Sequence, residues 1–277
     1  MKRVVKSVLI SNLVKSSLWS NYLNPDCLNE KVFLTIRQNR IDLYHRGGKL
    51  FSFDDQGFKT HIKYAAVIPR SKEDYLTESD LAKYSLVSNF EPNYSRIKEN
   101  CKNYSGIEAF GVSHLYHNHS YLSNENVVVL DIEISFDSLA EDKQQDRIDI
   151  VLYNKELRTL QFVEAKHYSN KELWSTSTPK VVDQIDRYQK KQISKKKTLI
   201  LKEYSKYIET INSIFGISLP TPLEVQDNVK LLIFGFDQDQ KQGRLTKQIL
   251  KNVAYNGIKI YSIGDIKKIV PENCWKA

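Results

Sequence analysis

Two neighbouring apolar segments decide the fold of this 277-residue chain: RIDIVLYN at residues 147–154 and TLQFVEAK at residues 159–166. Both are rich in branched apolar side chains, and a short connection separates them, which is typical of adjacent β-strands. A third segment of the same kind, VVVLDIEISF, precedes them at residues 127–136. We therefore expect these three segments to form neighbouring strands.

Helical patterns and two further strand patterns surround the three central strands. In chain order, the expected elements are helices at 94–104 and 107–119, the three strands, a helix at 179–214, a strand at 229–236, a helix at 241–254 and a strand at 258–264. The nearly continuous apolar run VKLLIFGF at 229–236 is typical of a strand covered on both faces. This alternation predicts an α/β fold class. A further helical pattern covers residues 75–90.

The N-terminal part of the chain has a different periodicity. From Val32 to Ile68 apolar and polar residues alternate in four runs separated by turn residues such as Gly47-Gly48, a signal for β-hairpins. We expect an N-terminal helix plus an antiparallel β-rich module over residues 1–68. The second domain then covers residues 69–277.

Composition predicts a folded protein of a reducing compartment. The chain is 41% hydrophobic and carries 41 Lys or Arg against 33 Asp or Glu, a net charge of +8, which excludes general disorder. Three distant cysteines provide neither a disulfide framework nor a zinc knuckle, so we expect a cytoplasmic location. Residues 4–23 have the pattern of an amphipathic helix, ended by Asn24-Pro25-Asp26, rather than of a signal peptide. No stretch approaches the roughly 20 apolar residues that span a bilayer, so no membrane partner is expected.

Strand alternation brings charged side chains together. In TLQFVEAK, Phe162, Glu164 and Lys166 share one face, and in RIDIVLYN Asp149 projects from the face opposite the core. If the two strands are adjacent, Asp149 and Glu164 can converge on one divalent cation. Two carboxylates suit Mg²⁺, and Mn²⁺ can substitute for it.

This trio suits phosphodiester hydrolysis. A bound Mg²⁺ would stabilise charge on the scissile phosphate and lower the pKa of a bound water, while Lys166 would hold or polarise that water. The bare Glu-x-Lys motif occurs only as often as chance predicts, and its other copy, Glu141-Asp142-Lys143, lies in a polar segment. The context of the Glu164 copy, at the end of an apolar strand, therefore carries the argument. The alternative is a surface-exposed strand end with an incidental ion pair.

The segments DRIDIVLYN, LQFVEAK and QIDRY resemble motifs of the PD-(D/E)XK nuclease superfamily over about residues 94–236. The resemblance implies a restriction-endonuclease-like core of helix, three strands, helix and strand. It also implies that Asp149 and Glu164 bind the metal, that Lys166 is the catalytic lysine, and that the carbonyl of Ala165 adds a ligand.

Two residues on the following helix extend the resemblance. Gln184 and Tyr188 match the Gln-x-x-x-Tyr motif of the RecB-type exonuclease branch. Their i, i+4 spacing places them on one helical face, where they can contact DNA or brace the active site. The alternative is an ordinary exposed Gln and a half-buried Tyr.

The sequence departs from the family pattern at one position, and it does not identify which residue of the preceding helix completes the pattern. Ile148 replaces the nominal proline before Asp149. Many members carry an acid or histidine on the preceding helix, and the candidates here are Glu99, Glu108, His114, His117 and His119. We prefer Glu108 as a metal ligand because it starts the helical segment nearest the first central strand. Asp131 and Glu133 are either extra ligands or ordinary ion-paired carboxylates.

A lysine-rich stretch follows the Gln-x-x-x-Tyr motif. Residues 179–206 hold nine Lys or Arg and three Asp or Glu, a local charge of 9 − 3 = +6. Its central cations are Lys190, Lys191, Lys195, Lys196 and Lys197. We expect this lysine strip to neutralise backbone phosphates, and the alternative is a solvated helix face.

Together these observations predict a cytoplasmic, Mg²⁺-dependent deoxyribonuclease. RNA stays open as a substrate, and a homodimer is one assembly that the resemblance allows. The rival interpretation is a non-catalytic protein on the same fold that binds nucleic acid or a protein partner.

Overall fold

A computed structural model describes residues 1–67, 85–86, 89–136, 147–175 and 179–277. The chain divides into two compact units: Val5–Ser113, and His114–Ala277 together with Met1–Val4. The domain boundary expected between residues 68 and 69 lies outside the described residues. The two units divide elsewhere, inside helix α6 (Ile107–Asn118).

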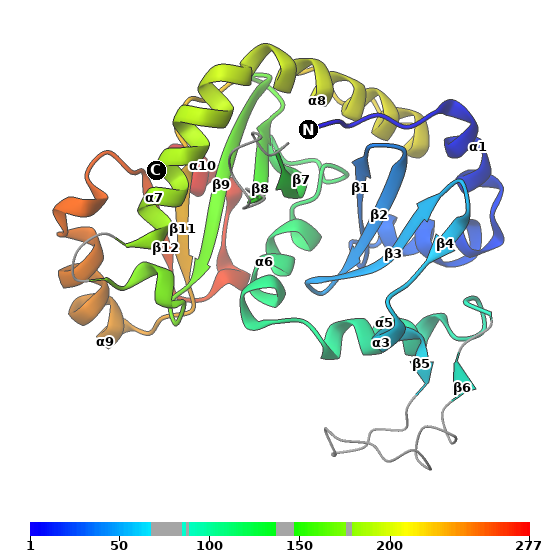
Figure 1. Cartoon of the computed structure of the whole chain (residues 1–277), viewed down its shortest axis with the longest axis horizontal. Coiled ribbons are helices and arrows are strands. Elements are labelled where there is room, and N and C mark those ends of the chain that lie inside the picture. Colours follow the sequence, from blue (N-terminus) through cyan, green and yellow to red (C-terminus); the bar gives the residue numbers. More distant parts are fainter. Residues whose placement is uncertain (68–84, 87–88, 137–146, 176–178) are drawn as a thin grey trace. The chain divides into compact units, whose positions relative to one another are not determined.

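The Val5–Ser113 unit contains the predicted antiparallel sheet, which is confirmed (Figure 1). Its strands pair in the order β1 (Phe33–Arg37), β2 (Arg40–His45), β3 (Gly48–Asp54), β4 (Gly57–Lys59). The other elements are α1 (Ser7–Lys15), η1 (Trp19–Leu23), α2 (Asn24–Leu28), α3 (Ile62–Ala65), the paired β5 (Ala66–Val67) and β6 (Ser85–Leu86), and α5 (Tyr94–Asn103). The hairpin at Gly47 has a two-residue turn in which Arg46 and Gly47 have φ of 49° and 88°, as a type I′ turn requires.

Two predictions for this unit were wrong. The last of the four alternating runs, FKTHIKYAAVI at residues 58–68, does not form one strand, because β4 ends at Lys59 and α3 lies between β4 and β5. Asn24-Pro25-Asp26 does not end the helical region but begins α2, since a proline in the first turn loses no intrahelical hydrogen bond. The helix expected at 75–90 lies mostly outside the described residues.

The His114–Ala277 unit is built on a mixed six-stranded sheet. Its main path runs β12 (Ile260–Ile263), β11 (Lys230–Phe234), β9 (Thr159–His167), β8 (Arg147–Asn154), β7 (Val127–Ser135), and β10 (Glu224–Val225) also pairs with β9. The pairs β7–β8 and β8–β9 are antiparallel, whereas β11 is parallel to both β9 and β12. All residues of the central strand β9 except the last are buried. The three predicted neighbouring strands are therefore confirmed.

The helices of this unit follow the expected order along the chain. After β9 come α7 (Lys180–Arg187), η3 (Tyr188–Ile193) and α8 (Ser194–Phe215), which Figure 1 shows as one long helical stretch. The remaining segments are η2 (Lys171–Leu173), α9 (Gln238–Gln240), η4 (Lys241–Leu250), η5 (Val253–Tyr255), η6 (Ile266–Lys268) and α10 (Pro271–Lys276). The fold class is thus mixed α/β. No helix in the described part of the chain is long and apolar enough to cross a membrane.

Gly235, which directly follows β11, lies in a closely packed part of this unit. Gly235 has φ of 82°, and a Cβ atom there would lie 2.2 Å from Nε2 of His167. We expect Gly235→Ala to lower the free energy of unfolding by more than about 2 kcal/mol, measured by urea denaturation, because the conformational cost of about 1–2 kcal/mol is joined by a clash.

Gly257→Ala is the matched control for this measurement. Gly257 has a similar φ of 85°, but a Cβ atom there meets nothing within 4 Å. Its substitution should show the conformational cost alone. Equal losses for the two variants would contradict the packing argument.

Candidate active site

The register of the β8–β9 hairpin brings the predicted carboxylates together. The β8–β9 ladder ends at the pair of Ile150 with Val163, and Asp149 and Glu164 are the next residues of their strands. Oδ2 of Asp149 also accepts a hydrogen bond of 2.8 Å from the backbone N–H of Ala165. The Asp149 carboxylate is therefore held against the strand segment that carries Glu164 and Lys166, and its convergence with Glu164 on one cation stays a prediction.

Lys166 completes this group through ion pairs. Its Nζ lies 2.9 Å from Oε1 of Glu164 and 3.0 Å from Oε2 of Glu172. Glu164 is 0% exposed and Lys166 is 6% exposed. The alternative of a surface-exposed strand end does not describe this site, because both charges are buried.

The electrostatics of Lys166 favour its charged form. Burial alone would lower the pKa of this ammonium group, but Glu164 opposes it through charge and a hydrogen bond. Asp149 and Glu172 act in the same direction, and the pKa ends above its ordinary value. Lys166 therefore stays protonated at neutral pH.

Glu172 was missed by the sequence argument. It lies in η2. The Asn170 side chain caps the start of this segment by accepting a hydrogen bond of 2.9 Å from the backbone N–H of Glu172. The signal available in the sequence was the capping residue Asn170 shortly after Lys166, which starts a new turn near the strand end. A short turn returning toward the strand can bring an acid back to the lysine.

Gln184 and Tyr188 act as a brace behind β8. Nε2 of Gln184 donates to the hydroxyl of Tyr188 at 2.6 Å, and that hydroxyl donates to the backbone carbonyl of Arg147. Tyr188 is buried and Gln184 is half-buried. Arg147 is two residues before Asp149, so the pair ties helix α7 to the strand that presents the carboxylate. Of the two roles expected for the motif, this geometry corresponds to bracing.

Of the remaining acidic candidates, two have partners of their own and the third belongs to the other unit. Glu108, in the first turn of α6, belongs to the Val5–Ser113 unit, so its role as a metal ligand stays a prediction. Asp131 is buried and accepts hydrogen bonds from Nε of Arg3 at 2.9 Å and from the Tyr204 hydroxyl at 3.0 Å. Glu133 forms a 2.6 Å ion pair with Arg147. Asp131 and Glu133 are therefore ion-paired carboxylates, the second of the two roles expected for them.

The predicted lysine strip is partly neutralised. Lys190 pairs with Asp186 at 2.8 Å and Lys197 with Asp227 at 2.6 Å. Lys196, at a kink in α8, donates to Oε1 of Gln192 at 2.7 Å. Lys191 and Lys195 are exposed. The strip presents less positive charge than its sequence indicates.

The donors at this site fit a hard divalent cation. Mg²⁺ is usually held by one or two carboxylates and keeps several waters, and Asp149 with Glu164 supplies that number. The N–H and C=O of one strand residue point to the same edge, so the carbonyl of Ala165 faces the side where its N–H meets Asp149. No group of three His, Cys, Asp or Glu side chains arranged to hold a metal occurs in the described ranges.

Comparison with protein-family models, curated proteins and solved structures found no match to the chain. The assignment of this site therefore depends on its own geometry.

The buried Glu164–Lys166 pair leads to a prediction about stability. We expect Lys166→Ala to lower the free energy of unfolding by roughly 3–5 kcal/mol, because it leaves the Glu164 carboxylate buried without its cation. Glu172→Gln removes the partner that is 42% exposed, so its cost should stay below about 1 kcal/mol. Urea denaturation of the three proteins measures both values.

The pH dependence gives a second check on Lys166→Ala. The pKa of Lys166 is raised above its unfolded value of about 10.4, so its stabilisation is complete below that pH and is lost only as pH rises through the folded pKa. The cost of Lys166→Ala should therefore not shrink between about pH 6 and about pH 9. It should grow as pH rises if the buried Glu164 carboxyl of the variant ionises over this range, because its charged form then has no cation beside it. A cost that shrinks over this range would show that Lys166 deprotonates there.

Proposed function

We propose that the His114–Ala277 unit is a metal-dependent nuclease that hydrolyses phosphodiester bonds in DNA. The observation that carries the proposal is the convergence of Asp149, Glu164 and Lys166 at one end of a buried strand. The order of three strands, a helical stretch and a further strand within this unit supports a restriction-endonuclease-like core.

In this proposal Asp149 and Glu164 hold Mg²⁺, with the carbonyl of Ala165 as a further oxygen donor. When bound, Mg²⁺ supplies positive charge at a phosphate oxygen and lowers the pKa of a coordinated water. Asp149 is held in position by the Ala165 N–H, so the carboxylate is oriented before the substrate arrives.

Lys166 has a role set by its charge. A lysine whose pKa is raised remains an ammonium at neutral pH, so it donates hydrogen bonds and does not accept a proton. It can hold the attacking water, and it can balance the negative charge that develops on the phosphate. Gln184 and Tyr188 are positioning residues in this scheme, because they hold the backbone of β8 and not the reacting atoms.

The proposal is tested with Asp149→Asn in the full chain. Asparagine keeps an oxygen that can accept the Ala165 N–H but loses the negative charge, so the fold should be retained. We expect Mg²⁺-dependent cleavage of plasmid and of oligonucleotides to fall at least about 100-fold. Wild-type cleavage by this variant would end the assignment.

Asp265→Asn is the matched control. Asp265 is exposed and also accepts a backbone N–H, that of Lys267 at 3.0 Å, so the same isosteric change is made away from the site. This variant should cleave like the wild type. An RNA oligonucleotide of the same sequence, run in parallel, decides which nucleic acid is the substrate.

The non-catalytic alternative has one observation in its favour: Glu164 is already ion-paired with Lys166. A protein that only binds nucleic acid would keep its affinity and show no turnover with Mg²⁺, Mn²⁺ or EDTA. A nuclease as proposed cleaves with either metal and stops when EDTA is added.

A further inference from the structure

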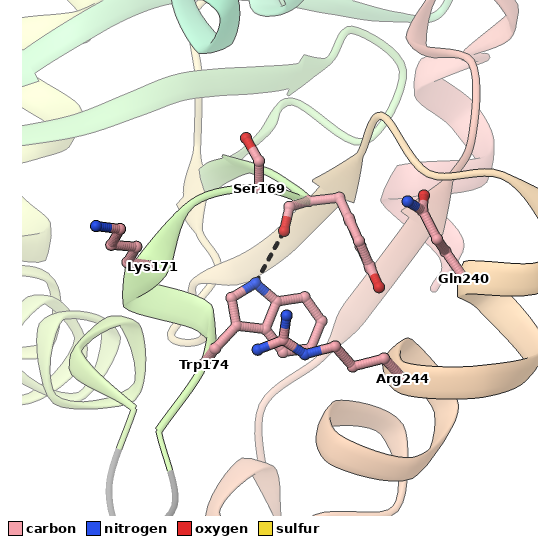
Figure 2. A pocket seen from close by; sticks show the side chains of 6 residues that line it. Ser169, Lys171, Trp174, Gln240 and Arg244 are labelled. Atoms are coloured by element: carbon pink, nitrogen blue, oxygen red, sulfur yellow. Dashed lines mark hydrogen bonds between the residues drawn. The ribbon is translucent and has the colours of Figure 1, made fainter.

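Two adjoining surface pockets in the His114–Ala277 unit share Trp174 and Arg244. The first, of about 550 Å³, is lined by Tyr168, Ser169, Lys171, Trp174, Gln240 and Arg244 (Figure 2). The second, of about 390 Å³, is lined by Trp174, Ser175, Arg244, Lys247, Gln248 and Asn252. We call the two pockets together the Trp174 cleft. The first pocket has the volume typical of small-ligand sites.

A stacked pair forms the centre of the Trp174 cleft. The guanidinium carbon of Arg244 lies 4.0 Å from the centroid of the Trp174 ring, and Figure 2 shows the guanidinium lying across the indole. Nε of Arg244 donates to Oε1 of Gln248 at 3.0 Å, which fixes the direction of the group. Arg244 itself is exposed, so the face turned away from Trp174 is open to a ligand.

Two contacts with Tyr168 hold Trp174 in place. Its Nε1–H donates to the carbonyl of Tyr168 at 2.9 Å, and the Tyr168 ring meets it edge-on at 5.0 Å. The tryptophan is half-buried, so it is a fixed platform and not a mobile surface residue. Because the platform is already ordered, a ligand that stacks on it loses less conformational entropy on binding.

The charge of the Trp174 cleft favours an anion. Lys171, Arg244 and Lys247 line it, and no acidic side chain lines either pocket in the described part of the chain. The lysine strip differs, because Asp186 and Asp227 pair with two of its cations. A phosphate therefore finds at the Trp174 cleft three cations with no carboxylate among the side chains that line it.

The cleft is also connected to the candidate active site through Glu172. This residue lies between Lys171 and Trp174 in the chain, and its Oε2 is 3.0 Å from Nζ of Lys166. The segment that carries the platform directly follows strand β9, which carries the trio. A DNA strand bound in the cleft would therefore contact a segment that follows Lys166, the proposed catalytic lysine, within a few residues.

We propose that the Trp174 cleft binds an unpaired nucleotide of single-stranded DNA, an inference that relies on the proposed function for the kind of polymer. The base stacks on the open face of the Arg244 guanidinium, and the adjacent phosphates contact Lys171 and Lys247. Bases stack readily on arginine planes and aromatic rings when they are unpaired, whereas duplex bases already have both faces covered. A planar stack beside three cations matches a nucleotide better than a simple anion.

The experiment measures binding without cleavage. All proteins carry Asp149→Asn and are kept in EDTA, and the probe is fluorescein-labelled oligo(dT) of about 12 nucleotides, with the matching dT·dA duplex as the second probe. Fluorescence anisotropy gives the affinity. We expect Trp174→Ala and Arg244→Ala each to weaken binding of the single strand about 10-fold or more, with a much smaller effect on the duplex.

Two conservative variants separate stacking from charge. Trp174→Phe keeps an aromatic face and should restore most of the affinity, while Arg244→Lys keeps the charge but not the plane and should not. Lys268→Ala removes an exposed cation outside the cleft and the lysine strip, and should change affinity less than about 2-fold. Because Arg244 is exposed, its variants should fold even if Trp174→Ala does not.

The outcomes distinguish this proposal from the proposed function. Wild-type affinity in Arg244→Ala, or full affinity in Arg244→Lys, would overturn the stacking subsite. An equal loss for single strand and duplex would also overturn it, in favour of general phosphate binding. If the wild-type protein shows no cleavage but Arg244→Ala still loses single-strand binding, the cleft stands and the nuclease assignment fails.

Discussion

A carboxylate and an ammonium group buried side by side at the end of a central strand constrain the His114–Ala277 unit. Removing two charges from water costs several kcal/mol per ion, and only close pairing with further polar partners offsets this. Lys166 meets that condition because Glu172 and Asp149 act on it in addition to Glu164. The packing of β8 on β9 and the return of η2 toward the strand bring Asp149 and Glu172 to this pair.

Stability alone does not explain this arrangement. Apolar residues of similar volume often stabilise a core as well as a buried ion pair does, so the proposed function gives this charged group a role that stability alone does not. The brace from Tyr188 to the carbonyl of Arg147 points the same way, since it fixes the strand two residues from Asp149. Supporting contacts of this kind are what a site needs to hold two carboxylates in a constant geometry.

Two basic surfaces of the unit differ in a way that charge counting along the chain does not reveal. The lysine strip is dense in sequence, yet Asp227, which is remote in sequence, neutralises Lys197. The cations of the Trp174 cleft are far apart in sequence, because they come from η2 and η4, which lie on either side of residues 174–240. What a polyanion meets depends on the carboxylates around each cation, and these are brought there by folding.

The sequence by itself determined the antiparallel N-terminal sheet, the three central strands and the sharing of one strand face by Glu164 and Lys166, because alternation and turn residues are local properties. It did not determine the start of α2 at Asn24, the end of β4 at Lys59 or the place where the two units divide. Only the tertiary structure decided the pairing of Lys166 with Glu172, the ion pair of Asp131 with Arg3, and the stacking of Arg244 on Trp174. The physical reason is that pairing partners are set by the return of the chain in space, which residue spacing does not encode.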